Sequence, residues 1–223
     1  MAWRSHGETN LEMLDNLRKN ELIKSDRVYE AMRKVDRGHF APYSPYRDAP
    51  QSIGHGVTIS APHMHANAAQ ALEQHLQPGM SALDVGSGSG YLLAVFAHMV
   101  QPEGKVVGIE YIPELVEKSK DNLRKDPTHA EMLKDGRIMI IGGDGSLGWP
   151  EGAPYDAIHV GAAAPRMPTH LIDQLRPGTG KMFIPVGQYE QAIWEVTKDA
   201  DGTVHKSKMY DVRYVPLHMQ PEN

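Results

Sequence analysis

The feature that most constrains the fold is a run of alternate glycines between a predicted strand and a predicted helix. The segment DVGSGSG covers residues 84–90 and overlaps the end of an apolar strand expected at 82–85. Alternate glycines allow a backbone to turn sharply and to approach a ligand closely where a helix begins. The loop therefore predicts an α/β sheet with a ligand site at the end of this strand.

Apolar segments alternate between strand and helix character from residue 80 onward. Strands are predicted at 82–85, 105–110, 137–142, 155–161 and 181–186, and helices at 90–99, 113–125 and 169–175. Nearly continuous apolar strands, such as KVVGIE, indicate a parallel sheet that is covered on both faces. Two further extended segments, 192–198 and 204–215, flank the turn dipeptide Asp201-Gly202. The predicted fold is a doubly wound, mostly parallel, Rossmann-like sheet that ends in an antiparallel hairpin.

The amino-terminal part of the chain is predicted to add helices to this sheet. Thr9 and Glu12 have capping-box spacing before one short helix, and Ser25 or Asp26 precedes a second. Prolines and glycines interrupt residues 41–62 and predict an irregular connection, after which 63–76 is compatible with a helix. We expect one domain over 1–223. Its parts are helices and an active-site loop at 1–78, a cofactor-binding core at 79–190, and a hairpin with a substrate edge at 191–223.

An acidic residue follows the next predicted strand and indicates which ligand the glycine loop binds. Glu110 ends the strand at 105–110, where a carboxylate can bind the two hydroxyls of a ribose. The glycine spacing is GxGxG instead of the dinucleotide pattern GxGxxG, and Asp84 precedes the first glycine by two residues. A carboxylate there would repel a pyrophosphate and suit a cation. These features favour a sulfonium nucleoside over a nicotinamide dinucleotide.

A third acidic position follows the strand at 137–142. Asp144-Gly145 stands in the string GGDG, so Asp144 is either a contact to an adenine amino group or a turn residue. A tight turn alone is also the alternative interpretation of the glycine cluster. However, Asp84, Glu110 and Asp144 all lie near strand carboxyl ends, where doubly wound sheets bind ligands. The coincidence favours a binding site.

Composition excludes several classes of function. The 23 Lys and Arg against 28 Asp and Glu give a net charge of -5 without a basic stretch, which disfavours nucleic-acid binding. The absence of cysteine excludes disulfides, thiolate metal sites and a cysteine nucleophile. His63 and His65 point to different faces of a helix, so no metal site is expected. No secretion signal is apparent, and the apolar run at 92–100 is too short to span a bilayer. We expect a cytoplasmic monomer.

Longer strings give the chain a family resemblance. The run DVGSGSG with Glu110 resembles class I S-adenosylmethionine-dependent methyltransferases, and the wider chain is similar to the protein-L-isoaspartate (D-aspartate) O-methyltransferase family. The matching strings are PYSPYRDAPQSIGHGVTISAPHMHA (42–66), LDVGSGSGYL, IGGDG, PYDAIHVGAAAP (154–165), LIDQLRPG (171–178), IPVG (184–187) and VRYVPL (212–217). The match covers essentially the full length. It departs at GTGK and at the short carboxyl terminus after Leu217.

The resemblance implies a reaction and a set of site residues. The donor would be S-adenosyl-L-methionine, with S-adenosyl-L-homocysteine as product. The acceptor would be the free α-carboxylate of L-isoaspartyl and D-aspartyl residues in damaged proteins. The methyl ester would close to a succinimide and so return the residue to normal aspartyl. The cofactor-binding positions that it implies are Val57, Thr58, Ile59, Ser60, His65, Asp84, Gly86, Gly88, Glu110, Tyr111, Asp144 and Gly145. A carboxylate with a pKa of about 3.5 to 4 is already ionised and needs no general base.

Ser60 is the predicted catalytic residue, because it matches the active-site serine of the family string TISAPH. Its hydroxyl would donate a hydrogen bond to the acceptor carboxylate and orient it. Spacing alone favours a different role, as the N-cap of a helix that begins at Ala61. His63 is expected to be structural. An edge strand at 213–217 is expected to pair with an extended peptide.

Two alternatives to a repair enzyme stay open from the sequence. One is an S-adenosylmethionine-binding adaptor that recognises modified protein ends without turnover. The other is a methyltransferase that acts on the carboxyl group of a small molecule. A labelled donor offered with paired peptides that contain Asp or isoAsp distinguishes all three.

Overall fold

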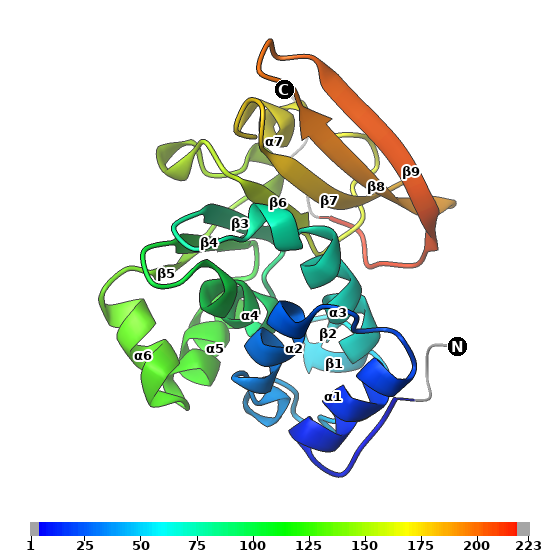
Figure 1. Cartoon of the computed structure of the whole chain (residues 1–223), viewed down its shortest axis with the longest axis vertical. Coiled ribbons are helices and arrows are strands. Elements are labelled where there is room, and N and C mark those ends of the chain that lie inside the picture. Colours follow the sequence, from blue (N-terminus) through cyan, green and yellow to red (C-terminus); the bar gives the residue numbers. More distant parts are fainter. Residues whose placement is uncertain (1–4, 218–223) are drawn as a thin grey trace.

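The computed structural model describes residues 5–217 and has the predicted α/β class. A seven-stranded sheet with the order β5-β4-β3-β6-β7-β8-β9 runs through the molecule (Figure 1). Its strands are β3 Ser81–Val85, β4 Lys105–Glu110, β5 Ile138–Gly142, β6 Ala157–Val160, β7 Lys181–Val186, β8 Gln191–Lys198 and β9 Val204–Val212. The strands from β5 to β7 are parallel, and β8 and β9 are antiparallel. The predicted parallel sheet with its carboxyl-terminal hairpin is confirmed.

The direction in which the chain adds strands reverses at β3. From β3 the chain proceeds outward through β4 to β5, and it then returns to place β6 on the other side of β3. Such a reversal leaves a crevice at the carboxyl ends of the two central strands, which is where open α/β sheets bind ligands. The glycine loop follows β3, and Gly161 follows β6, so both lie at this crevice.

Helices cover both faces of the sheet. They are α1 Asn10–Lys19, α2 Asp26–Arg33, α3 Pro62–Ala71, α4 Tyr91–Val100, α5 Pro113–Arg124, α6 Pro127–Lys134 and α7 Thr169–Asp173. Short 3-10 turns lie at η1 Arg37–His39, η2 Glu73–His75, η3 Gly145–Leu147 and η4 Pro150–Gly152. Every residue of α4 except His98 is buried, because this helix is apolar all round and lies between the sheet and α2 and α3. Among the residues from 5 to 217, no helix has the length and apolar character needed to cross a membrane.

Alternate strand residues divide the interior into two apolar clusters, as the period of a β-strand requires. Ala82 and Val106 pack with the amino-terminal helices and α4, whereas Leu83, Val85 and Val107 pack with residues around α7. Asp84 lies on the same face as Ala82, so its carboxylate enters the α4 side of the sheet. The Asp84 carboxylate therefore lies on the face of the sheet that packs against the first cluster.

The structure differs from the sequence predictions in one segment and adds a helix in another. Residues 41–62 are not irregular throughout, because β1 Gln51–Gly54 and β2 Val57–Ile59 form an antiparallel hairpin with a positive φ at His55 and Gly56. Helix α6 was not predicted, although Asp126 accepts hydrogen bonds from the Thr128 and His129 amides as its N-cap. Both elements are short, and neither has enough apolar residues to establish a period.

Capping predictions had mixed outcomes. The hydroxyl oxygen of Thr9 accepts a hydrogen bond from the Glu12 amide at 3.1 Å, and that of Ser25 accepts one from the Val28 amide at 3.3 Å, as predicted. Ser60 is not an N-cap. Helix α3 has Ala61 at this position without a side-chain cap, because Pro62 is the first helical residue. The alternative structural role for Ser60 is therefore removed.

Candidate functional site

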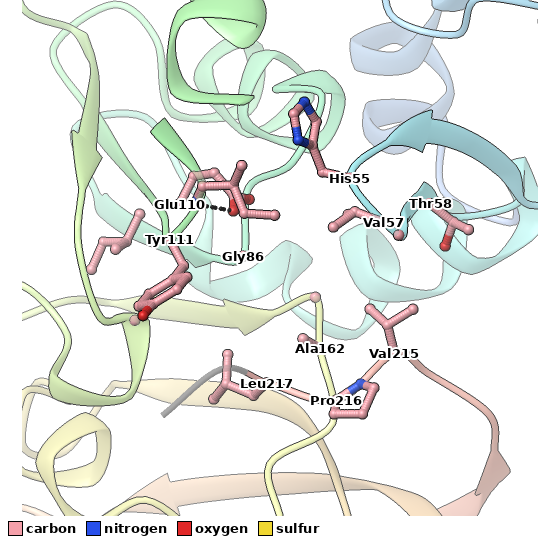
Figure 2. Close-up of a pocket in the computed structure, with 15 residues that line it drawn as sticks. His55, Val57, Thr58, Gly86, Glu110, Tyr111, Ala162, Val215, Pro216 and Leu217 are labelled. Atoms are coloured by element: carbon pink, nitrogen blue, oxygen red, sulfur yellow. Dashed lines mark hydrogen bonds between the residues drawn. The ribbon is translucent and has the colours of Figure 1, made fainter. Parts of the chain in front are cut away.

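Three connected cavities lie at the carboxyl ends of β3, β4 and β6. The inner cavity, of about 170 Å³, lies between Val57-Thr58, Glu110-Tyr111 and residues 215–217 (Figure 2). The polar cavity, of about 30 Å³, lies beside the glycine loop and is lined by side chains that include Asp84, Ser87 and His65. The outer groove, of about 620 Å³, extends from Ser60 past Met64 to Tyr210 and Arg213. Thr58 and Gly161 line all three, so the cavities meet at these two residues.

The glycine loop follows β3 in a conformation that only glycine adopts readily. Gly86, Gly88 and Gly90 have φ angles of +70°, +52° and +84°. The amides of Gly86 and Ser87 donate to the carbonyl oxygen of Ile109 at 2.8 and 3.0 Å, which fastens the loop to the end of β4. The loop thus presents its backbone to the inner and polar cavities from a fixed position.

Glu110 closes this arrangement from β4. Its carboxylate accepts hydrogen bonds from the Gly88 amide at 2.9 Å and from the Ile112 amide at 3.0 Å. Although the residue is only 5% exposed, it lines the inner cavity, where Figure 2 places it beside Gly86 and Tyr111. A carboxylate offers about four acceptor positions, so each oxygen can accept a further bond from a ligand hydroxyl.

Asp84 has a partner that sequence reasoning missed. Asp84 and His159 are neighbours in the register of β3 and β6, and His159 Nδ1 lies 2.7 Å from Asp84 Oδ1. The imidazole also stacks on Phe183, with ring centroids 6.1 Å apart. Both residues are buried and line the polar cavity. The parallel register of two strands that end in Asp-Val-Gly and His-Val-Gly was the signal that would have paired them.

One residue that lines the polar cavity, Ser87, has a buried hydroxyl group without a protein partner. The hydroxyl oxygen of Ser87 is buried and has no hydrogen bond to any residue from 5 to 217. Buried hydroxyl groups without partners are rare, because losing water without a replacement costs about 1 to 3 kcal/mol. The cavity is also lined by the polar residues His65, Asp84 and Ser89, and this lining suits the polar end of a ligand.

Gly145 lines the inner cavity, and its neighbour Asp144 bonds within the turn that follows. A Cβ atom on Gly145 would lie 2.5 Å from Val85 Cγ1, so a larger residue does not fit. Asp144 lines none of the three cavities; its carboxylate accepts hydrogen bonds from the amide and the hydroxyl group of Ser146 at 2.9 and 2.7 Å. This geometry is that of a turn residue, and the contact of Asp144 with an adenine amino group stays a prediction.

Ser60 lies between the polar cavity and the outer groove. It follows β2, and its carbonyl oxygen accepts a hydrogen bond from Arg37 Nη2 at 2.7 Å. His63 has the structural environment that was expected, because its Nδ1 lies 2.7 Å from the buried Asp48 carboxylate. Within residues 5–217, no cluster of three His, Asp or Glu side chains is arranged to hold a metal ion.

The predicted edge strand at 213–217 was wrong. Strand β9 ends at Val212, and the segment after it is already paired within the protein. The Ala163 amide donates to the Val215 carbonyl, and the Leu217 amide donates to the Ala163 carbonyl, both at 2.8 Å. Residues 215–217 instead form a wall of the inner cavity, and Val215 also lines the outer groove. The chain that follows Leu217, where the family match departs, lies outside the described residues.

Most of the predicted site residues converge on the crevice. Val57, Thr58, Gly86, Glu110, Tyr111 and Gly145 line the inner cavity, and Ile59, Ser60, His65, Asp84 and Gly88 line the polar cavity. Sequence reasoning missed Gly161 and Ala162, and a Cβ atom on Gly161 would lie 3.0 Å from the Gly86 carbonyl oxygen. The predicted strand at 155–161 included Gly161, whereas β6 ends at Val160 and leaves Gly161 in the loop that follows it.

Comparisons with known proteins agree on one family. The sequence model described as protein-L-isoaspartate(D-aspartate) O-methyltransferase matches residues 8–222. A protein-L-isoaspartate O-methyltransferase of Caenorhabditis elegans is 52% identical over 224 residues, covering 100% of this chain and 98% of that protein. The corresponding enzyme of Triticum aestivum is 51% identical and covers 94% and 91%.

A solved structure has the same fold over nearly its whole length. It is a crystal structure from Plasmodium falciparum assigned to protein-L-isoaspartate O-methyltransferase, in complex with S-adenosyl-L-homocysteine. The TM-score is 0.88 at 38% identity, and the match covers 95% of this chain and 99% of the other.

Proposed function

Because the chain belongs to the protein-L-isoaspartate (D-aspartate) O-methyltransferase family, we propose that its cavities divide the two ligands of that reaction between them. The protein is a methyltransferase that uses S-adenosyl-L-methionine, gives S-adenosyl-L-homocysteine and acts on isoaspartyl residues of proteins. The inner and polar cavities would receive the donor, and the outer groove would receive the acceptor peptide. The observation that supports this division is that all three cavities share Thr58 and Gly161.

The donor fits the inner and polar cavities by the chemistry of their residues. Glu110 would accept hydrogen bonds from the ribose hydroxyls, while Val57, Thr58, Tyr111 and Gly145 would enclose the adenosine. The charged amino-acid end would lie in the polar cavity, with His65, Asp84 and Ser89 beside it. Gly86 allows close approach, because a Cβ atom there would lie 3.8 Å from that of Ala162 and would narrow the cavity.

The acceptor chemistry requires the protein mainly to position the acceptor carboxylate against the methyl group of the donor. S-adenosyl-L-methionine supplies a methyl group that its sulfonium already activates. An acceptor carboxylate with a pKa of about 3.5 to 4 carries its own negative charge, so no side chain has to remove a proton. Ser60 would donate a hydrogen bond to this carboxylate at the edge of the groove and hold it in line with the methyl group. Return of the methyl ester to aspartyl through a succinimide needs no further residue.

We also propose that the enzyme works as a cytoplasmic monomer and binds neither nucleic acid nor membranes. Residues of one chain line all three cavities, so a second copy is not needed to complete the site. The net charge of -5 gives no electrostatic attraction to phosphate backbones, and a chain without cysteine tolerates a reducing compartment.

Paired peptides test the proposed acceptor. The protein is incubated with methyl-labelled donor and with two peptides that differ only in Asp or isoAsp. Base-labile label on the isoAsp peptide alone supports the proposal. Donor binding without transfer would indicate an adaptor, and label confined to small carboxylic acids would indicate a small-molecule methyltransferase.

Replacement of Ser60 tests the orienting hydroxyl. We expect Ser60→Ala to lower kcat/KM for the isoAsp peptide about tenfold, because one hydrogen bond to a charged group is lost. The matched control is Ser207→Ala in the exposed strand β9, which lines no cavity. If Ser60→Ala keeps the activity of the Ser207→Ala variant, the hydroxyl has no orienting role.

A further inference from the structure

A buried arginine lies behind the site. The Arg37 side chain is fully buried, and its charge interacts with the buried carboxylate of Asp48, which also lies 2.7 Å from His63 Nδ1. Burial lowers the pKa of Arg37 to about 10, so the guanidinium remains charged at neutral pH. Burying a charge costs free energy unless the group is paired and hydrogen-bonded, so the partners of Arg37 at this position are informative.

We call the region where the polar cavity meets the outer groove the transfer site. The Arg37 guanidinium contacts residues on both sides of it. Nη2 donates to the Ser60 carbonyl oxygen at 2.7 Å, and Nη1 lies 3.2 Å from His65 Nδ1. The charge also lies over the Tyr91 ring, 5.3 Å from its centroid, and the Tyr91 and His65 rings are 4.9 Å apart. Tyr91 is the first residue of α4 after the glycine loop. Arg37 therefore joins Ser60, His65 and the start of α4.

The contact with His65 fixes where the imidazole carries its proton. Burial, together with the Arg37 charge, holds the pKa of His65 well below its ordinary value, so the ring is neutral and has one N–H group. A guanidinium can only donate hydrogen bonds. Nδ1 must accept from it, and the proton must therefore be on Nε2.

The Nε2 atom of His65 is available to bind a ligand. It has no hydrogen bond to any residue from 5 to 217, and the His65 side chain lines the polar cavity with Asp84 and Ser87. With the opposite tautomer, Nε2 would present a lone pair there and would repel a carboxylate. With the tautomer that Arg37 imposes, it presents a hydrogen-bond donor.

We infer that Arg37 is a positioning residue of the transfer site, which holds the Ser60 carbonyl and keeps His65 as an Nε2–H donor toward the carboxylate of the bound cofactor. This inference rests on the proposed function, since it uses the placement of the cofactor's amino-acid end in the polar cavity. Arg37 itself touches neither ligand. Its effect passes through His65 and through the backbone of Ser60.

The tautomer is measurable in the free protein. Long-range ¹H–¹⁵N correlation spectra give the protonation state of each imidazole, and the spectrum of a His65→Gln variant identifies the His65 signals among the 12 histidines. We expect a neutral ring with Nε2–H at pH 7. A neutral ring with Nδ1–H, or an imidazolium, would overturn the inference whether or not the enzyme methylates isoaspartyl peptides.

Replacement of Arg37 provides the second test. We expect Arg37→Met to raise the Kd for S-adenosyl-L-homocysteine about tenfold, because the donor to its carboxylate is no longer fixed. The matched control is Arg27→Met, since Arg27 also donates to carbonyl oxygens, those of Glu73, Leu76 and Met99, but does not contact the site. Both variants should lose thermal stability, whereas only Arg37→Met should lose affinity. Equal affinity in the two variants would overturn the inference.

A double-mutant cycle separates positioning from stability. In the His65→Gln background, Arg37→Met should change the Kd for S-adenosyl-L-homocysteine much less than it does in the native protein, because the imidazole tautomer no longer exists to be fixed. Additive effects would mean that Arg37 acts independently of His65 and would contradict the inference. This binding assay contains no methyl transfer, so a failure of the proposed acceptor chemistry leaves its result readable.

Discussion

The two walls of the transfer site are built on different principles. The donor wall, formed by residues 86–90, Glu110 and Gly145, consists of backbone and of one carboxylate that is already bonded within the protein. The acceptor wall, formed by Met64 and residues 210–214, borders the outer groove alone and presents exposed side chains such as Arg213. A donor of constant structure can be met by a rigid backbone. An acceptor that varies in sequence requires a wide groove with few fixed contacts.

This difference predicts which variants affect which ligand. Substitutions on the donor wall should change affinity for S-adenosyl-L-homocysteine, whereas those on the acceptor wall should change only the KM of the peptide. Each variant below is matched to a control that makes the same chemical change elsewhere.

The largest effect is expected from Gly86→Val on the donor wall. Valine is strained at a φ of +70°, and its side chain would extend toward Ala162 into the inner cavity. We expect affinity for S-adenosyl-L-homocysteine to fall by about 100-fold or more in a calorimetric titration. Gly202→Val is the control, because Gly202 has a φ of +89° in the β8–β9 turn with open space around it. If both variants bind equally well, the cavity is not the donor site.

A smaller effect on the same ligand is expected from Glu110→Gln. The amide side chain cannot accept from both the Gly88 and Ile112 backbone groups and also receive a ribose hydroxyl. The Kd for S-adenosyl-L-homocysteine should rise about tenfold, with the peptide KM unchanged at saturating donor. Glu114→Gln, on the exposed surface of α5, should leave both values unaltered. If only the peptide KM changed, Glu110 would belong to the acceptor wall, which would contradict its assignment to the donor wall.

On the acceptor wall, Arg213→Gln should affect the peptide alone. Arg213 is exposed in the outer groove and forms no ion pair with a residue between 5 and 217. We expect the KM of an isoAsp peptide with acidic neighbours to rise about fivefold at low salt and less at high salt. Lys206→Gln removes the same charge from β9 outside the groove and should change little. Loss of donor affinity in Arg213→Gln would mean that the two walls are not independent.

The smallest effect is expected from Lys118→Met in α5. The Lys118 ammonium donates to the Ile53 carbonyl oxygen at 2.7 Å and ties the β1–β2 hairpin to the core. Loss of this bond should raise the peptide KM about twofold and lower the free energy of unfolding by less than about 1 kcal/mol. Lys120→Met, which removes a surface pair with Glu117, provides the comparison. Indistinguishable kinetics for the two variants would show that the hairpin does not need this tie.

The same contrast explains what the sequence could predict. The donor wall follows regular apolar strands, so β4 and β7 were predicted with their observed bounds and the glycine loop was located directly. The β1–β2 hairpin was missed because its glycines and neighbouring prolines hide the alternation of a strand. Arg37 and His159 acquire their roles only from partners 28 and 75 residues away, and no local pattern records such distances.

Residues 215–217 have a consequence for how the two ligands influence each other. Two hydrogen bonds to Ala163 secure this segment, and Val215 faces both the inner cavity and the outer groove. A donor that contacts Val215 would thus form part of the surface that the acceptor meets. By thermodynamic linkage, any factor by which the donor changes acceptor affinity equals the factor by which the acceptor changes donor affinity. We expect any heterotropic cooperativity between the two ligands to be transmitted through residues 215–217.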